Sequence, residues 1–323
     1  MNSDTGATGL ALLAFLGAGH THTEEGRYQH TVTRGLRWLA SHQSGDGNFF
    51  TGGDGHAALY SQAIACMAIC ESLAMTEDKA LQKPAVKGLN FIIRAQNKTS
   101  GGWRYVPGFD ADTSVLGWQL FALRSAQFAG FALPKNTIAL TRRYVDSAST
   151  DRRRATYGYM PGWAPSPSMT AEGLLARQYL GWDRDHPAMV EGVSLVSSSL
   201  HADEMGRNIY YWYYATQLLH NFGGPTWDAW NAKMRDTLIA EQLTRPGCSR
   251  GSWDPTWPEP DAWGARAGRV YQTALSLLCL EVYYRFLPLY RTEELDLVEG
   301  MEKGRGKDPD AVVEKEKGPA GGR

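Results

Sequence analysis

A nine-residue pattern recurs in this chain at a fixed spacing, and it restricts the fold more than any other feature of the sequence. Gly-Leu-x-aromatic-aliphatic-x-x-x-Gln occurs at 35–43 and again at 88–96, and each copy is followed by a glycine-rich turn that closes on Phe49 or Trp103. A weaker third copy closes on Trp253. Self-similarity at a period of about fifty residues is typical of architectures that stack one supersecondary unit on the next. The sequence therefore predicts a repeat protein.

Two kinds of helix alternate along the repeats. Apolar residues cover most faces of the first kind, which indicates helices that are buried on all sides. These helices are predicted at 5–18, 58–74, 112–129, 169–180, 208–221 and 268–286. The second kind carries charged residues at the spacing of a solvent-facing side. These helices are predicted at 27–42, 79–96, 134–149, 186–200 and 226–243.

Alternating buried and amphipathic helices close most simply into a double ring, with the buried helices as the inner wall. The predicted fold is therefore all-α, an α/α toroid of five to six helix pairs that occupies residues 1–290. Six inner helices against five outer ones indicate that an N-terminal outer helix is missing. Residues 291–323 are charged, rich in glycine and poor in aromatic residues, which predicts a disordered tail.

Composition excludes several classes of function. A net charge of −1 gives no broad attraction to nucleic acid. Cys66 and Cys70, together with two further cysteines, are too few for a disulfide framework in a chain of 323 residues, so a reduced, cytoplasmic protein is the simplest interpretation. His20 and His22 in a loop are only a weak metal signal, and the sequence predicts no metal site and no cofactor.

The stretch "DADTS" at 110–114 stands where an inner helix begins. In a double ring all inner helices run in the same direction, so their N-termini share one face and their dipoles favour carboxylates there. Asp110 and Asp112 are therefore candidate site residues at the mouth of the ring. The plainer interpretation is that both are helix-capping carboxylates.

The Gln/Gly/aromatic turns resemble the QW repeat of squalene–hopene and oxidosqualene cyclases, within the wider group of terpenoid cyclase and protein prenyltransferase α/α toroids. More narrowly, the chain is similar to single-toroid bacterial proteins with prenyltransferase/squalene-oxidase repeats. The resemblance covers residues 3–290. It implies a toroid that holds an apolar, isoprenoid small molecule in its central cavity, and a terpenoid cyclase-like isomerase or lyase reaction if the protein is an enzyme.

The acids of those cyclases are replaced here. Their Asp-x-Asp-Asp-Thr-Ala motif, aligned on Thr113, places the proton donor on Ala111, and their Asp-Cys-Thr-Ala-Glu motif resembles "SMTAEG" with Ser168 at the acid position. An alkene is a very weak base and needs a strong, desolvated acid, which neither residue supplies. The resemblance then leaves Asp110 or Asp112 as the acid, with Glu172 as a supporting polar group.

Five consecutive aromatic residues, 210–214, open the predicted inner helix 208–221. At helical spacing they cannot all face the same way, so some face the ring interior. We expect Tyr210, Trp212 and Tyr213, together with Trp118, to line the ligand site, because aromatic faces stabilise cations. The alternative is that they only fill space between inner helices.

Two other classes of function stay open from the sequence. One is a non-enzymatic scaffold whose mouth binds another protein, and a peripheral membrane contact is equally open. The other is a carbohydrate-active α/α barrel, in which Asp110, Asp112 and Glu172 would flank a sugar. The side chains that could stack on its sugar rings are Trp118, Trp163, Trp212 and Trp263. A polar cleft with two carboxyl groups would favour this last class over an apolar cavity or a plugged barrel.

Overall fold

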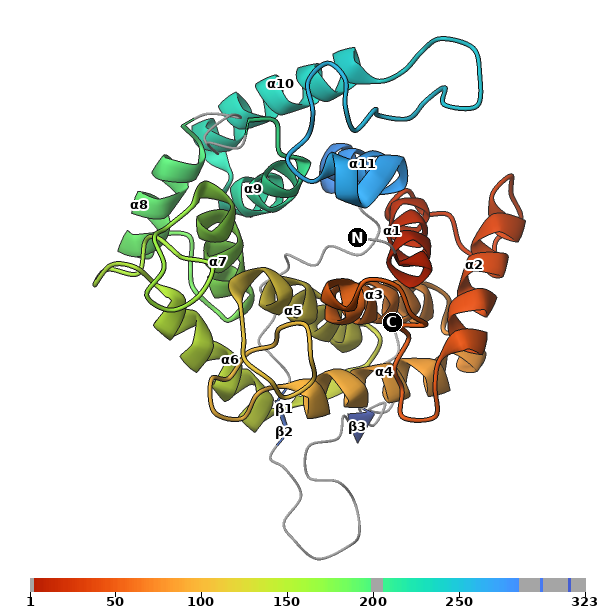
Figure 1. The fold of residues 1–323 in the computed structure, drawn as a ribbon, viewed down its shortest axis with the longest axis horizontal. Coiled ribbons are helices and arrows are strands. Elements are labelled where there is room, and N and C mark those ends of the chain that lie inside the picture. Colours follow the sequence, from red (N-terminus) through yellow and green to blue (C-terminus); the bar gives the residue numbers. More distant parts are fainter. Residues whose placement is uncertain (1–2, 199–205, 285–296, 299–312, 315–323) are drawn as a thin grey trace, which may run out of the picture.

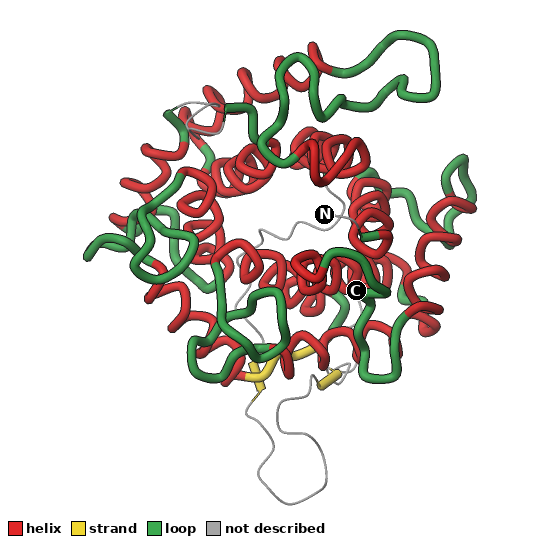
Figure 2. The backbone as a smooth tube through the Cα atoms, in the orientation of Figure 1, coloured by secondary structure: helices red, strands yellow, loops and turns green. Residues whose placement is uncertain are grey.

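The computed structural model describes residues 3–198, 206–284, 297–298 and 313–314, and within them eleven α-helices form two concentric rings (Figures 1 and 2). The predicted α/α toroid is confirmed. The inner ring consists of α1 (Asp4–Gly17), α3 (Ala58–Thr76), α5 (Thr113–Phe128), α7 (Pro167–Tyr179), α9 (Ile209–Phe222) and α11 (Gly264–Leu280). The outer ring consists of α2 (Gln29–His42), α4 (Gln82–Ala95), α6 (Lys135–Ala148), α8 (Pro187–Val196) and α10 (Gly224–Glu241).

The inner helices are apolar on nearly every face because each packs on two inner neighbours and on the outer ring. The ring closes where α1 packs against both α3 and α11. Gly9 allows the close approach of α1 to α3, since a Cβ there would stand 2.8 Å from Ile64. One stretch, Gly55–Thr76, is long and apolar enough by composition to cross a membrane, but 83% of its most apolar window is buried inside the fold, as expected for a core helix.

The outer helices are amphipathic, as predicted. In α2 the buried residues are Val32, Leu36 and Leu39, which recur at the spacing of one helix face. Charged side chains occupy the opposite face of the same helix, and α4 and α6 follow the same design. Burial of one apolar stripe against the inner ring therefore fixes the orientation of each outer helix.

The repeated glutamine joins neighbouring outer helices. The Nε2 of Gln43 donates to the carbonyl of Gly47 in its own turn, at 3.2 Å, and to Pro84 in α4, at 3.0 Å. Gln96 repeats this arrangement, because its Nε2 donates to Gly101 at 2.9 Å and to Thr137 in α6 at 3.0 Å. Each glutamine thus ties the end of one outer helix to the start of the next.

The glycine and the closing aromatic residue of each repeat also have structural roles. Gly101 has φ +94°, and a Cβ there would lie 2.2 Å from the carbonyl oxygen of Leu140. The indole N–H of Trp103 donates to Ile92 and that of Trp253 donates to Leu238, both at 2.7 Å. The repeat motif therefore encodes how an outer helix ends and turns inward, which is a requirement of the fold and not of any reaction.

Long loops and short connections lie at opposite ends of the ring. The loops that enter inner helices, at 43–57, 96–112, 149–166 and 242–263, gather at the N-terminal ends of those helices, and we call this end the mouth. The connections that leave inner helices are mostly shorter, and α9 passes to α10 through Gly223 alone. This asymmetry gathers the long loops, which are the segments that most often carry binding and catalytic residues, at the mouth.

A small sheet lies outside the rings. Strand β1 (Phe131–Pro134) pairs in parallel with β2 (Leu297–Val298) and antiparallel with β3 (Val313–Glu314), in the order β2-β1-β3. At these positions the structure shows paired strands where the sequence predicted a disordered tail. The other residues of 291–323 lie outside the described residues, and the division of the chain at residue 290 stays a proposal.

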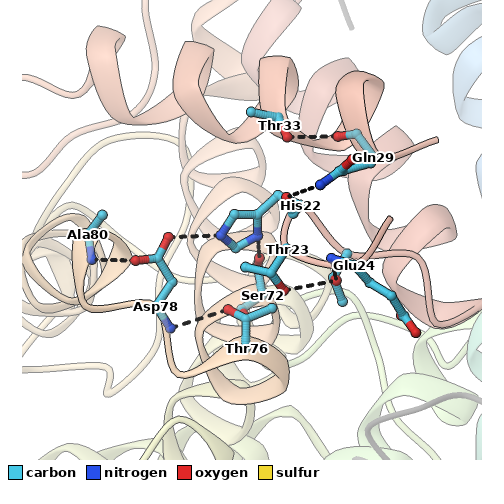
Figure 3. Close-up of polar contacts among 10 residues, drawn as sticks. His22, Thr23, Glu24, Gln29, Thr33, Ser72, Thr76, Asp78 and Ala80 are labelled. Atoms are coloured by element: carbon cyan, nitrogen blue, oxygen red, sulfur yellow. Dashed lines mark hydrogen bonds and ion pairs between the residues drawn. The ribbon is translucent and has the colours of Figure 1, made fainter. Parts of the chain in front are cut away.

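The histidine-containing connection 18–28 is a structural bridge at the end opposite the mouth (Figure 3). Nε2 of His22 lies 2.8 Å from Oδ2 of Asp78, and its Nδ1 lies 3.2 Å from Oγ of Ser72. These partners are those of a hydrolase triad, but Ser72 is fully buried and cannot meet a substrate. The contacts join the connection 18–28 to the C-terminal end of α3.

His20 and the two cysteines of α3 lie apart from one another. His20 packs edge-on against Tyr28, with ring centroids 4.8 Å apart. Cys66 and Cys70 are buried thiols inside α3. Among the residues that the structure describes, no group of three or more His, Cys, Asp or Glu side chains could hold a metal ion.

Candidate active site at the mouth of the toroid

Two carboxyl groups meet one guanidinium where α5 begins. Asp112 is the N-cap of α5, and its Oδ1 accepts from the N–H of Val115 at 2.8 Å. Its Oδ2 lies 3.3 Å from Nε of Arg104, whose Nη1 donates to Oδ2 of Asp110 at 2.8 Å. The helix-cap interpretation of Asp112 is therefore confirmed, and Arg104 adds a second set of contacts that a cap alone does not require.

The two acids differ in access to solvent. The side chain of Asp112 is fully buried, whereas that of Asp110 is 38% exposed. Asp110 has φ +60°, a left-handed conformation that is uncommon outside glycine and clusters at functional sites. The backbone thus turns sharply at Asp110 and presents its carboxyl group at the surface of the mouth.

Tyrosine hydroxyl groups surround this cluster. Tyr159 donates to Oδ2 of Asp112 at 2.9 Å, and its hydroxyl is hydrogen-bonded to that of Tyr105. The guanidinium of Arg104 lies over the Tyr105 ring at 5.0 Å and over the Tyr159 ring at 5.8 Å. A chain of hydroxyl groups therefore leads from the buried carboxyl of Asp112 toward the partly exposed tyrosines.

Glu172 supplies a third carboxyl group from the neighbouring helix α7. Its Oε2 accepts from the hydroxyl of Tyr210 at 3.0 Å, and the same hydroxyl lies 3.3 Å from the carbonyl oxygen of Ser114. Ser114 donates in turn to Oδ1 of Asp112 at 3.3 Å and is hydrogen-bonded to Tyr60. Polar groups thus connect Glu172 to Asp112 across the boundary between α5 and α7.

Burial changes the protonation of both buried acids. Loss of solvent raises the pKa of Asp112 to about 6, although the N–H of Val115 and the hydroxyl of Tyr159 oppose the rise. Burial also raises the pKa of Glu172 well above its ordinary value, against the smaller opposing effect of the Tyr210 hydroxyl. Burial therefore favours the neutral form of Glu172, and Asp112, with a pKa of about 6, exchanges its proton near physiological pH.

Exposed aromatic side chains stand on three of the mouth loops. Their exposed fractions are 73% for Phe109, 57% for Trp163, 51% for Trp257 and 39% for Trp263. Trp163 lies beside Tyr159, with ring centroids 5.5 Å apart, and so continues the aromatic surface outward from the acid cluster. Large aromatic rings left in water on a loop face are available to a ligand.

The aromatic wall predicted inside the ring is mostly packed against itself. Tyr213 stacks on Trp118 across the ring interior, with centroids 5.4 Å apart and planes at 11°, and both side chains are buried. Trp212 is also fully buried. Tyr210 is the half-buried member, and it points its hydroxyl at Glu172. The interior between α5 and α9 is thus filled by rings at this depth.

The positions aligned with cyclase acids lie close to the mouth without an acid. Ala111 is buried between Asp110 and Asp112, and a Cβ built on Gly102 would contact it at 2.8 Å. Ser168, in the first turn of α7, accepts from Nδ2 of Asn208 at 3.4 Å. The loop residues Arg104 and Tyr159 were missed from the sequence, and the only signal for them was their proximity to the Trp103 turn and to a tyrosine-rich loop.

No protein-family model matches this chain, and no curated protein matches it. Similar folds occur among solved structures. An inactive variant of the α-1,6-mannanase GH76A of Salegentibacter sp., with two neighbouring aspartates replaced and α-1,6-mannotriose bound, is 12% identical, with a TM-score of 0.59 over 87% of this chain and 88% of that one. Cellobiose 2-epimerase from Spirochaeta thermophila is 14% identical, with a TM-score of 0.62 over 86% and 84%. An α-amylase from Clostridium perfringens is 9% identical, with a TM-score of 0.57 over 86% and 85%.

These neighbours correct the family resemblance drawn from the sequence. The resemblance to terpenoid cyclases and prenyltransferases, and the apolar isoprenoid ligand that it implied, are wrong, because the similar structures are carbohydrate-active and two of them hold manno-oligosaccharides. The physical reason is that the Gln/Gly/Trp turns encode helix connections, which any α/α toroid needs. The chain is an α/α toroid like these enzymes, and the alternative of a carbohydrate-active barrel fits them better than the isoprenoid-binding interpretation.

Proposed function

We propose that the protein is a carbohydrate-active enzyme that binds a glycan at the mouth of the toroid and hydrolyses a glycosidic bond. The observation that carries the proposal is the pair of carboxyl groups on Arg104, one exposed and one buried with a pKa near 6. Glycosidases work with two such carboxyl groups in different protonation states. Asp110 and Asp112 supply two such carboxyl groups beside one helix start, one exposed and one buried.

The two acids have separate roles in this proposal. Asp110 is the exposed carboxylate and accepts the proton of the attacking water. Asp112 is the acid. When Asp112 is protonated, its hydrogen bond with Tyr159 reverses, so that Asp112 donates to the tyrosine oxygen and the tyrosine hydroxyl gives its own proton to the leaving oxygen. The bond between the anomeric carbon and the leaving oxygen breaks as the water oxygen bonds to that carbon, so atoms and charges balance.

The surroundings of the acids suit a sugar better than a hydrocarbon. Arg104, Tyr105 and Tyr159 present hydrogen-bonding groups, while Trp163 and Phe109 offer flat apolar faces beside them. A sugar ring has polar hydroxyl edges and apolar C–H faces, so mixed polar and aromatic walls match both. Glu172 acts as a positioning residue, because its carboxyl group accepts from the hydroxyl of Tyr210.

The comparisons supply further support. The mannanase neighbour binds α-1,6-manno-oligosaccharides, and its inactive variant lacks two neighbouring aspartates. The other two neighbours are a cellobiose epimerase and an amylase. This chain shares two features with the mannanase: the toroid fold, and two aspartates that lie close together in the sequence.

The test is incubation of the purified protein with α-1,6-manno-oligosaccharides, malto-oligosaccharides and cellobiose, followed by chromatography with mass detection. We expect shortened products from at least one series, and a loss of about 10²–10⁴-fold in rate for Asp110→Asn and for Asp112→Asn. Asp185→Asn is the control, because Asp185 is 95% exposed near the start of α8, far from the mouth, and should keep full activity. Turnover by Asp110→Asn at the wild-type rate would refute the assigned roles, and binding without turnover in every sample would refute hydrolysis.

A further inference from the structure

A buried arginine organises the mouth loop that leads into α11. The side chain of Arg207 is 1% exposed, and its Nη1 donates to the carbonyl oxygens of Asp254 and Trp257, both at 3.0 Å. Its Nη2 lies 2.7 Å from Oε2 of Glu241 at the end of α10. A buried charge is costly unless it is paired and hydrogen-bonded; here Glu241 supplies the opposite charge and the loop carbonyls accept from Nη1.

A second set of hydrogen bonds holds the C-terminal end of the same loop, 242–263. Oδ2 of the buried Asp261 accepts from the N–H of Ile209 at 2.7 Å, and its Oδ1 accepts from the N–H of Trp263 at 3.0 Å. The N–H of Ala262 also donates to the carbonyl of Arg207 at 2.8 Å. Because Arg207 directly precedes the N-cap of α9, these contacts anchor the loop to the inner ring.

The anchored loop carries exposed aromatic rings. Trp257 is 51% exposed although its own carbonyl oxygen is held by Arg207, so the backbone is fixed while the indole faces water. Trp263 follows at the start of α11 and is 39% exposed. A fixed backbone under an exposed ring lowers the entropy that a ligand must remove on binding.

This loop leads into α11, and α11 lies across the ring from α5, where the acid cluster stands. In the six-helix ring α11 packs on α9 and α1, whereas α5 packs on α3 and α7, so the two helices face each other (Figure 1). Neighbouring packed helices are spaced 8–10 Å apart, so axes on opposite sides of such a ring are roughly 16–20 Å apart. That span exceeds the length of a single sugar ring.

We infer that Arg207 is a positioning residue that presents Trp257 as a second sugar platform, and that the ligand is an oligosaccharide long enough to reach from Asp110 to this platform. The inference rests on the proposed function, because it concerns the same mouth and the same class of ligand. The inference adds two points to that function. The affinity for a glycan depends on the length of the glycan, and Arg207 affects this affinity only by positioning Trp257.

The experiment is isothermal titration of the α-1,6-manno-oligosaccharide and malto-oligosaccharide series, from disaccharide to hexasaccharide, into the wild type and five variants. Trp257→Ala should weaken binding of the longest ligand about tenfold and leave the shortest ligand that binds unchanged. Trp257→Phe should keep most of the affinity, because a flat ring remains. Tyr284→Ala is the matched control, because Tyr284 is a 63% exposed aromatic residue beyond the C-terminal end of α11.

The arginine is tested by coupling. Arg207→Lys keeps a positive charge but loses the planar guanidinium fork, which reaches Glu241 through Nη2 and the loop carbonyls through Nη1. It should therefore weaken the same long ligands. Added to Trp257→Ala it should cause no further loss, which a general structural defect would not reproduce. Equal affinity of Trp257→Ala and Tyr284→Ala for every length, or full additivity of the double variant, would overturn the inference while the proposed function stands. Absence of binding to the wild type in both series would overturn both.

Discussion

The carboxyl group of Glu172, on α7, lies directly against the backbone of Gly117, on the neighbouring helix α5. A Cβ added at position 117 would stand 1.9 Å from Oε1 and 2.7 Å from the carboxyl carbon. Glycine inside a helix costs about 1 kcal/mol relative to alanine, so its presence here needs a reason. The reason is space for a buried carboxyl group that reaches across to the hydroxyl of Tyr210.

We therefore expect Gly117→Ala to lower the free energy of unfolding by about 1–3 kcal/mol, as other overpacked core sites do. In a Glu172→Ala background the obstacle is gone, and the same substitution should be neutral or stabilising by up to about 1 kcal/mol. Urea unfolding of the four proteins measures both values. Equal destabilisation in the two backgrounds would show that the carboxyl group does not occupy this space.

A second prediction concerns the pH dependence of stability at Asp112. Its folded-state pKa of about 6 lies above the ordinary value of 3.8, so the folded protein binds more protons between these values, and stability falls as the pH rises from about 4 to above 6. Asp112→Asn keeps the cap and removes the ionisation. Relative to the wild type, the variant should gain at most about 3 kcal/mol in unfolding free energy on going from pH 4 to pH 7. Parallel pH profiles, measured by urea unfolding, would contradict the raised pKa.

The repeat glutamines should differ in their contribution to stability according to burial. Gln96 is buried and joins two carbonyl groups, Gly101 and Thr137, whereas the half-buried Gln242 donates to Gly251 through an exposed contact at 3.0 Å. We expect Gln96→Ala to cost about 2–3 kcal/mol, because buried carbonyls lose their donor, and Gln242→Ala to cost less than about 1 kcal/mol. Thermal and urea unfolding of the pair check this ranking, and a reversed order would contradict the role assigned to the repeat.

We expect Ser72, His22 and Asp78 to have no nucleophilic activity, although they are arranged like a hydrolase triad. Ser72 has no exposed surface, so a fluorophosphonate probe should leave it unlabelled in the folded protein, as detected by intact-mass spectrometry. Ser72→Ala should leave glycan binding and turnover at wild-type levels and cost about 1 kcal/mol in stability. Stoichiometric labelling at Ser72 would show instead that the site opens to solvent.

Most helix positions could be read from the sequence because each class of helix has its own hydrophobic pattern. The inner helix predicted at 112–129 is observed as α5, Thr113–Phe128, and the outer helix predicted at 79–96 contains α4, Gln82–Ala95. The last inner helix was predicted to begin at 268, but α11 begins at Gly264 and contains a non-helical Gly268 with φ +78°. A glycine can adopt this left-handed conformation, but its presence in a sequence does not show that it does, because tertiary packing decides the local conformation.

The candidate site was only half visible in the sequence. Asp110, Asp112 and Glu172 could be chosen because carboxyl groups at helix starts are an identifiable signal. Arg104 and Tyr159 could not, because they stand in loops without periodicity and reach Asp112 only through folding. The aromatic residues predicted to line the ligand site do lie on inner helices, as expected. Trp118 and Tyr213, however, stack on each other across the ring and are buried in that contact.

The sequence by itself determined the architecture, because apolar periodicity and the Gln/Gly/Trp turns are local constraints that each repeat satisfies with its neighbours. It also suggested a family whose chemistry does not apply, since those same constraints serve every toroid of this kind. Only the tertiary structure decided which groups meet at the mouth. The pKa of Asp112, the burial of Glu172 against Gly117 and the clamp of Arg207 on the Trp257 loop all arise from contacts between segments far apart in the chain, where burial and distance set the chemistry.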